Sequence, residues 1–411
     1  MIRHDKRVLG QASTLYEPGV DFERLRRERW EKVQREMATR DIGALVLTDQ
    51  NNIRYTTGLS VMPIWTSYNL AHYVVVPAEG KPTIFEFILA AHRAKPFFED
   101  VRPPQYWQAR FAGKEAEQFS LGWASEIKDL LKEWGVADGK IGIDILDFNG
   151  FDALQKQGLT LTDADESLEA ARAIKTLDEL ELLRQSAAVC ETALYEMEQA
   201  IRPGISENEL MGVYWHRLLD LGGEYMSTRL LVSGSKTNPW FHEAGSKLVR
   251  PGDLVAIDCD SIGPEGYLCD ISRTFLCGEQ GTREQKEAYQ IAHDYVHAVA
   301  EELKVGVSFQ EFAERVPKPP VGYRELWMPA ILHGIGTDNV PPIVPTPGYG
   351  EENNWFAMPE GEFEENMVVS IEAYAGKVGA QEGVKLEDEV WISADGPVQI
   401  SLYPYEEKLL T

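Results

Sequence analysis

Apolar residues in the first part of the chain alternate between helical and strand-like spacing. Residues 21–40 place apolar side chains at helical intervals among many charges, which predicts an amphipathic surface helix. The short apolar run at 43–49 predicts a buried strand. Two strands joined by a turn, a further helix and a last strand are predicted to follow at 71–87, 115–134 and 140–146. This alternation predicts a small α/β domain over residues 1–165.

The pattern changes in residues 166–411. From Ser167 a run rich in Leu, Ala, Glu and Arg predicts one long helix that ends at Pro203. Ser206 is the expected N-cap of the next helix, 206–221, because Glu209 completes a capping box. Another helix is expected at 283–303, with strands at 230–234, 253–263, 270–278, 367–375 and 384–393. The second domain is therefore predicted to be α+β.

Composition and charge narrow the class of protein. The chain has 411 residues, of which 44% are hydrophobic and 26% charged, as in an ordinary globular protein. The net charge of −26 disfavours nucleic acid and anionic membranes as partners. Four cysteines without a CxxC pair, no apolar core of a signal peptide and no membrane-spanning stretch predict a reduced, cytoplasmic protein.

Acidic residues inside apolar strands are the first chemical signal. Asp258 and Asp260 stand two apart in one predicted strand, so they are expected to face the same side. A turn at residues 263–266 would then bring Asp270 onto the neighbouring strand. An unpaired buried carboxylate is costly, and a divalent cation relieves the repulsion among three of them. The pattern therefore predicts a cation site here.

Three more residues fit such a site. Glu372 and Glu387 each stand in an apolar strand, and His333 follows an apolar run before a glycine-rich turn. Taken alone, each residue has an ordinary structural explanation, such as a turn, an edge or a solvent-facing strand position. Together, carboxylates and one imidazole suit iron, manganese, cobalt or zinc with positions open to water or substrate.

The second half resembles the pita-bread fold of methionine aminopeptidase, aminopeptidase P, prolidase and creatinase. The motifs that carry this resemblance are RAIKTLDELELLRQS, PGISENEL, HGIG-T-D, VVSIEAY and VKLEDEV. The first domain matches the creatinase-type N-terminal domain in placement. The resemblance implies a homodimer and a site for two divalent ions held by Asp258, Asp260, Asp270, His333, Glu372 and Glu387.

Other motifs resemble the dimethylsulfoniopropionate lyases of the DddP type, a branch of the same fold. These are NIRYTTGLSVMPIW, TRLLVSGSKTNPWF, the Asp-x-Asp pair and the closing LYPYE. The resemblance implies removal of a Cα proton from the substrate and β-elimination of dimethyl sulfide, which leaves acrylate. Trp65 and Trp240 are candidates to hold the sulfonium by cation–π attraction, although core packing explains each equally well.

Two positions keep an alternative open. The lyases carry their catalytic base six residues after the metal-binding histidine, where this chain has Asn339; Asp338 stands one residue earlier and is the expected base. His242 stands where the peptidases carry a substrate-facing histidine. The peptidases usually carry a further histidine shortly after the motif that contains His333, and this chain has none there. A metal-dependent Xaa-Pro aminopeptidase or prolidase-like hydrolase is the second hypothesis. Amidino or ring hydrolysis, and a binding protein without activity, rank lower.

Overall fold

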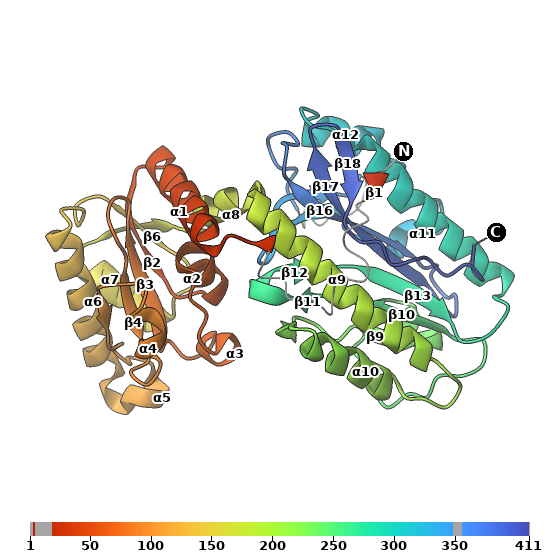
Figure 1. The fold of residues 1–411 in the computed structure, drawn as a ribbon, viewed down its shortest axis with the longest axis horizontal. Helices are drawn as coiled ribbons and strands as arrows, with labels where there is room; N and C mark the ends of the chain where they lie inside the picture. Colours follow the sequence, from red (N-terminus) through yellow and green to blue (C-terminus); the bar gives the residue numbers. More distant parts are fainter. Residues whose placement is uncertain (1–2, 5–18, 348–355, 411) are drawn as a thin grey trace. The chain divides into compact units, whose positions relative to one another are not determined.

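The computed structural model describes residues 3–4, 19–347 and 356–410, and it divides into two compact units (Figure 1). One unit is Phe22–Ala171. The other begins at Arg172 and includes β1 (Arg3–His4), which pairs with β18 (Gly396–Gln399). Helix α8 (Asp165–Ala173) spans the place where the units divide. A domain boundary after residue 165 stays a prediction.

The Phe22–Ala171 unit is a sheet between two layers of helices. Its strands run in the order β5 (Val101–Arg102), β4 (Thr83–Glu86), β3 (His72–Pro77), β2 (Ile42–Leu47), β6 (Lys140–Ile143) and β7 (Thr160–Asp163). Strands β2, β6 and β7 are parallel, whereas β3 is antiparallel to both β2 and β4. The predicted α/β character of this part of the chain is therefore confirmed.

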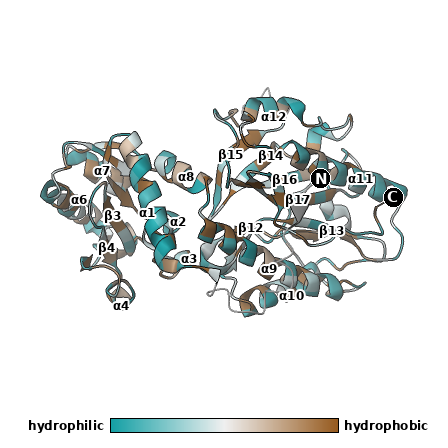
Figure 2. Cartoon of the chain, turned by 45° about the horizontal axis from the view of Figure 1, so that its top comes forward, coloured by the Kyte–Doolittle hydropathy of each residue, from teal (hydrophilic) through white to brown (hydrophobic). Residues whose placement is uncertain are grey.

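Alternate residues of β2 explain the two helical layers. Ala44 and Val46 belong to a core shared with α6 (Ala116–Glu133) and α7 (Phe148–Lys156). Leu45 and Leu47 face the opposite core, which is shared with α1 (Phe22–Thr39), α2 (Gln50–Thr57) and α8. The sheet is thus apolar on both faces, and its strands are brown in Figure 2. The remaining helices are short: α3 (Pro63–Thr66), α4 (Ala91–Ala94) and α5 (Ala109–Ala112).

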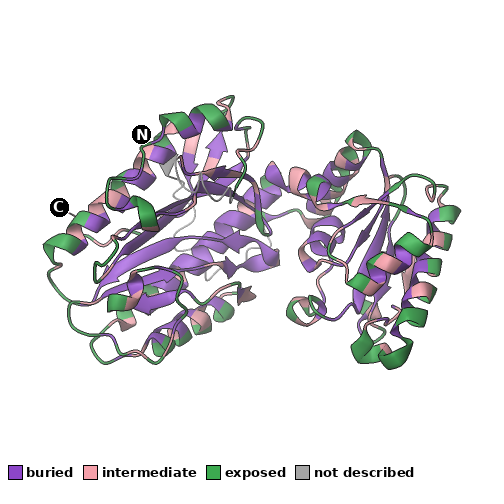
Figure 3. Cartoon of the chain, turned by 180° about the vertical axis from the view of Figure 1, so that it is seen from behind, coloured by how far each residue is buried: buried purple, intermediate pink, exposed green. Residues whose placement is uncertain are grey.

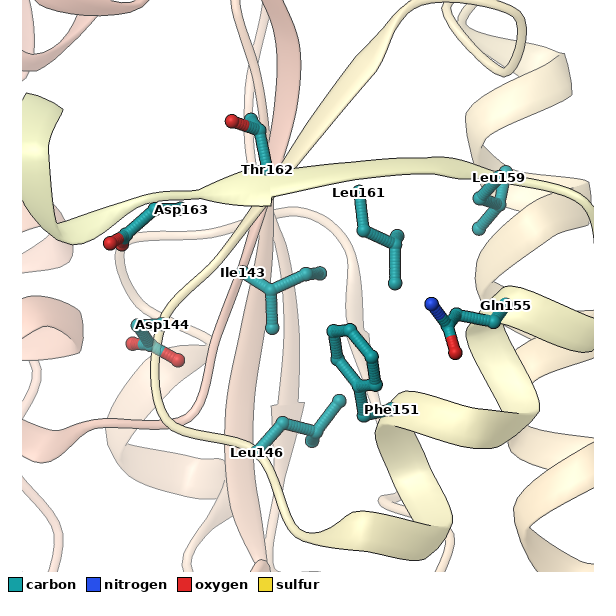
Figure 4. A pocket seen from close by; sticks show the side chains of 9 residues that line it. All are labelled: Ile143, Asp144, Leu146, Phe151, Gln155, Leu159, Leu161, Thr162 and Asp163. Atoms are coloured by element: carbon teal, nitrogen blue, oxygen red, sulfur yellow. The ribbon is translucent and has the colours of Figure 1, made fainter.

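A cavity of about 390 Å³ lies beside the carboxyl ends of β6 and β7 (Figure 4). Apolar side chains, among them Phe151 and Leu161, face one another across it, and Asp144 stands at one side. The Asp144 carboxylate accepts hydrogen bonds from the backbone N–H groups of Thr48 at 2.8 Å and Asp49 at 3.0 Å. Burial nevertheless raises the pKa of Asp144 to about 7.

The second unit contains a long antiparallel sheet. Its strands run in the order β15 (Asn339–Pro345), β14 (Ala330–Ile335), β16 (Val368–Ala375), β17 (Val384–Ser393), β13 (Ser272–Leu276), β10 (Leu254–Asp258) and β9 (Leu231–Ser233). Strand β18 joins β17. A smaller sheet has the order β12 (Leu268–Cys269), β11 (Ser261–Ile262) and β8 (Tyr225–Met226). In Figure 3 the strands are buried, whereas outward helix faces are exposed.

Four helices accompany these sheets: α9 (Leu177–Ala200), α10 (Glu207–Asp220), α11 (Arg283–Glu302) and α12 (Phe309–Arg315). The predicted single helix from Ser167 is wrong, because the chain is extended at Thr176, which caps α9 with Glu179. The capping box of Ser206 and Glu209 is confirmed. Within the described ranges, no helix has the length and apolar character needed to cross a bilayer.

The predicted strand 253–263 is interrupted in the structure. Strand β10 ends at Asp258, and Asp260 has a left-handed backbone with φ 34° before β11 begins. The expectation that Asp258 and Asp260 lie along one strand is therefore wrong. The expected reversal of the chain is confirmed, because Ser261 pairs with Cys269 in the hairpin of β11 and β12.

Candidate metal centre

The register of the long sheet places the acidic residues on one face. Across β10, β13, β17 and β16 it sets four residues in a row, each opposite the next: Asp258, Ser272, Glu387 and Glu372. Directly opposite residues of an antiparallel pair point to the same face. His333 of β14 pairs with Ser370, which shares the face of Glu372 two residues further along β16. Separate segments of the chain thus meet on one surface.

The ligand atoms of these residues form two groups. Asp270, His333 and Glu387 each offer an atom within 4.8 Å of the others, and so do Asp258, Asp260 and Asp270. The Nε2 atom of His333 lies 3.6 Å from Asp270 Oδ2, 3.6 Å from Glu387 Oε1 and 3.7 Å from Glu372 Oε1. Ligands about 2 Å from one ion are spaced at roughly such distances. Asp270 belongs to both groups.

Burial and neighbouring charges together shift the pKa values of these groups. Burial, followed by the charges of Glu387 and Asp260, raises the pKa of Asp270. Burial and the charge of Asp258 raise the pKa of Asp260 to about 7. Burial alone would lower the pKa of His333, but Glu387 and Glu372 raise it to about 9. Burial is the main cause of the raised pKa of the two aspartates, and the neighbouring carboxylates add to it. For the pKa of His333, the neighbouring carboxylates outweigh the effect of burial.

The donor set fits a divalent metal ion. The Oδ1 atom of Asp270 is buried and has no hydrogen-bond partner among the described residues. Leaving a charged oxygen in this state is costly unless a cation binds it. Oxygen ligands with one imidazole suit a transition metal rather than a structural cysteine site.

Lys385 is a neighbour of the site that the sequence analysis missed. Its buried Nζ lies 2.8 Å from Glu387 Oε2, 3.1 Å from Glu372 Oε2 and 3.4 Å from Asp258 Oδ2. Lys385 precedes Glu387 by two positions in β17, so both side chains lie on the same face. This spacing of two residues in a predicted strand could have identified Lys385 as a neighbour of Glu387 from the sequence. One ammonium group still leaves the carboxylates in excess.

Hydroxyl groups and a rear ion pair hold the ligands in place. Ser272 Oγ lies 2.9 Å from Asp258 Oδ1 and 2.8 Å from Glu387 Oε2. Behind this face, Arg273 Nη2 lies 2.8 Å from Asp388 Oδ1, and both side chains are buried. Arg273 also donates to the backbone oxygen of Glu387 at 2.8 Å. The pair therefore connects β13 to β17 on the face of the sheet opposite to the proposed ligands.

A cavity of about 550 Å³ opens over the acidic residues. Besides the proposed ligands, its walls include apolar and polar side chains from several loops and strands. The apolar residues are Leu230, Phe241, Met328, Pro329, Ala330, Ile343 and Phe356, and the polar ones are Thr228, Glu243 and Asn339. The Thr228 hydroxyl donates to Asp260, which holds that carboxylate at the cavity wall. The space suits a small molecule.

The other predicted site residues are placed less directly. Asp338 is exposed, and its Oδ1 accepts the N–H of Asn339 at 2.8 Å. Asn339 lines the cavity, whereas Asp338 and the exposed His242 are not among the described lining residues. Their roles stay predictions.

The two candidate tryptophans lie in different units. Trp240 is 6% exposed and packs in the core near Tyr374, with ring centroids 6.3 Å apart. This is the core-packing alternative that the sequence left open, and the residue of this segment that lines the cavity is its neighbour Phe241. Trp65 lies in α3 of the other unit, beside Phe87. A role for Trp65 at the substrate stays a prediction.

Comparison with known proteins identifies the fold. Residues 29–174 match the creatinase/prolidase N-terminal domain. A recombinant prolidase from Thermococcus sibiricus superposes with a TM-score of 0.75 at 21% identity, covering 94% of this chain and 98% of that one. These findings confirm the predicted pita-bread architecture with a creatinase-type N-terminal domain.

Two relatives are similar along almost the whole chain. The dimethylsulfoniopropionate lyase DddP of Roseovarius nubinhibens is 29% identical, over 95% of this chain and 88% of its own. The DddP lyase of Roseobacter denitrificans is 27% identical with the same coverage. Residues 181–394, which include every proposed ligand, match the model of metallopeptidase family M24. Because that match spans more than half of the sequence, the chain belongs to metallopeptidase family M24.

Proposed function

We propose that this protein is a metal-dependent lyase that cleaves dimethylsulfoniopropionate to dimethyl sulfide and acrylate. The observation that carries the proposal is the position of Asp260, which joins Asp258 and Asp270 in a second ligand group. Both aspartates of the Asp-x-Asp pair can therefore offer a ligand atom to the same ion. The similarity to two DddP lyases over 95% of the chain supports the same activity.

The proposed ligands are Asp258, Asp260, Asp270, His333, Glu372 and Glu387, for two divalent ions such as iron, manganese, cobalt or zinc. A bound metal ion supplies positive charge for a substrate carboxylate and increases the acidity of the neighbouring C–H bonds. Lys385 holds Glu372 and Glu387 from the side, so the chain fixes the orientation of the carboxylates. The Ser272 hydroxyl does the same for Asp258.

The reaction needs a base for the Cα proton. We propose Asp338, whose loop carries it next to the cavity-lining Asn339. Its carboxylate takes the proton, the C–H electrons form the Cα–Cβ double bond, and the C–S bond breaks with its electrons on sulfur. Acrylate, dimethyl sulfide and one proton result. The amide of Asn339 cannot accept this proton, and the base has to approach the Cα hydrogen within about 3 Å.

Hydrolysis of Xaa-Pro peptides is the second candidate, because the chain belongs to a metallopeptidase family and its fold matches a prolidase. Under this hypothesis, His242 contacts the substrate. His242 is exposed on the loop that also carries Phe241 to the cavity. A homodimer and a cytoplasmic location are part of the proposal as well, and light scattering of the purified protein tests the first.

The test is release of dimethyl sulfide into the headspace by protein loaded separately with iron, manganese, cobalt and zinc. An Xaa-Pro dipeptide assay runs in parallel. We expect sulfide from dimethylsulfoniopropionate, loss of it with chelator, and loss of it in Asp338→Asn. Dipeptide cleavage without sulfide would replace the lyase by the peptidase. Sulfide release that is undiminished in Asp338→Asn would keep the lyase and remove Asp338 as its base.

A further inference from the structure

Helix α11 carries a pair of histidines that the proposed function does not use. His293 and His297 are four residues apart in α11, so their side chains leave the same face of the helix, one turn apart. Both side chains are partly exposed, and their ring centroids are 4.1 Å apart. Neither residue belongs to the two ligand groups of the candidate metal centre.

Tyr405 connects this pair to the side of the sheet that faces away from the acidic residues. Its ring centroid lies 4.8 Å from that of His293 and 5.4 Å from that of His297. The Tyr405 hydroxyl donates to Asp388. Asp388 follows Glu387 in β17, so its side chain lies on the opposite face of that strand. An ion held by the histidines is therefore separate from any ion on the acidic face.

Hydrogen bonds fix the proton positions of both imidazole rings. His297 Nδ1 lies 2.8 Å from the backbone oxygen of His293, and His293 Nδ1 lies 3.2 Å from Asp294 Oδ1. Carbonyl and carboxylate oxygens only accept, so each Nδ1 carries the hydrogen. Each neutral ring then has its lone pair on Nε2, and no described residue forms a hydrogen bond with either Nε2. Two unused nitrogen lone pairs thus lie one helical turn apart.

This arrangement is the ligand pattern of a transition-metal ion. Histidines at i and i+4 on a helix can give two nitrogen ligands to one ion. Metal-binding imidazoles usually donate their other N–H to a carboxylate or a backbone oxygen, as both rings do here. Burial lowers the pKa of His293, which favours the neutral ring that a metal ion requires. Packing against Tyr405 explains where the rings lie, but it does not use the Nε2 atoms.

We propose that His293 and His297 form a further metal site, which binds a zinc or copper ion through the two Nε2 atoms. Imidazole nitrogen suits these ions, whereas manganese and magnesium prefer oxygen ligands. Among the residues that the structure describes, no third ligand forms a group with the two rings, so water completes the coordination. The bound ion joins two successive turns of α11 beside Tyr405.

Equilibrium dialysis against buffered free zinc tests the site on the full chain. The zinc content of the parent is compared with that of His293→Gln and of His297→Gln by inductively coupled plasma mass spectrometry. Ions in the acidic centre cancel in this difference. We expect the parent to bind one ion more, and each variant to bind this ion at least about tenfold more weakly. The loss of either ring should have the same effect, because one imidazole alone holds zinc weakly.

Matched variants and a second metal separate this site from the acidic centre. His92→Gln in α4 and His216→Gln in α10 change exposed histidines elsewhere, and they should bind as much zinc as the parent. Manganese content should be the same in the parent and in all four variants, since manganese prefers oxygen. A thermal melt shows that each variant is folded.

Two outcomes would overturn the site. Equal zinc content in the parent, His293→Gln and His297→Gln would mean that the pair only packs against Tyr405. A loss of zinc that is accompanied by an equal loss of manganese would mean that the substitutions disturb the acidic centre instead. Neither result depends on whether the protein releases dimethyl sulfide.

Discussion

The two units both bury carboxylates, but they treat them differently. In the Phe22–Ala171 unit, Asp144 accepts the backbone N–H groups of Thr48 and Asp49 and a side-chain N–H of Asn52. This acid has its own neighbouring donors. In the other unit the proposed ligands crowd onto one sheet face, where Lys385 and His333 are shared among them.

This difference distinguishes a buried acid with a structural role from a buried acid that lacks sufficient counter-charge. Burial itself does not distinguish the two, since burial raises the pKa of both Asp144 and Asp270. What differs is the balance between negative charges and nearby donors. A buried charge without sufficient partners is strongly destabilising. The deficit in the second unit therefore supports the proposal that a cation binds there.

The largest expected effect comes from Asp270→Ala. Because Asp270 belongs to both ligand groups, its removal should abolish activity and reduce the metal content at both positions. Inductively coupled plasma mass spectrometry of the dialysed protein measures the metal. Asp144→Asn is the matched control from the other unit and should keep its full metal content. An Asp270→Ala protein with unchanged metal stoichiometry would show that the ligand set is wrong.

Lys385→Met should lower the free energy of unfolding of the metal-free protein. It removes a buried cation from between carboxylates and should cost about 3–5 kcal/mol of unfolding free energy. Urea unfolding in the presence of chelator measures the loss. Lys385→Arg keeps the charge and should lose less. If the Met variant were as stable as the parent, then Lys385 would not balance the carboxylates in the absence of metal.

Asp144→Asn should change how stability depends on pH. The pKa of about 7 in the folded protein exceeds the ordinary value for Asp, so the folded state holds the proton more tightly. The stabilising contribution is complete below about pH 4 and is lost as pH rises through 7. The Tm of the parent should therefore fall relative to that of Asp144→Asn between about pH 5 and pH 8. Parallel Tm curves would contradict the assigned shift.

The smallest effect on stability is expected for Phe241→Gly. Glycine adopts positive φ freely, which relieves about 1 kcal/mol of strain, but its greater freedom in the unfolded chain offsets a similar amount. The Tm in a thermal melt should therefore stay nearly unchanged. A large drop in Tm would instead show that the ring stabilises the fold.

Sequence alone identified the candidate ligands, because acidic residues in or beside apolar strands, and a histidine at the end of an apolar run, are unusual. It also predicted most helices and strands, since their periodicity is local. It missed Lys385 as a neighbour of Glu372 because only the register of β16 and β17 brings them together. The break at Asp260 was not predictable, because Asp tolerates a strand as well as a left-handed turn.

The choice between Trp240 and Phe241 shows another limit. Both aromatic residues occur in the same motif, and nothing local decides which one enters the core. The backbone of Phe241 has a positive φ, and the neighbouring side chains of Trp240 and Phe241 point in different directions. The Trp240 ring packs in the core beside Tyr374. Such a decision depends on contacts between segments that lie far apart in the sequence.

The row of Asp258, Ser272, Glu387 and Glu372 across four strands also bears on the order of events during synthesis. The first ligand leaves the ribosome long before β17, which carries Glu387 near the end of the chain. No shorter nascent chain has the complete ligand set, and pairing of distant strands is slow. Metal capture is therefore a late step, and it stabilises only chains whose last long strand has found its place in the sheet.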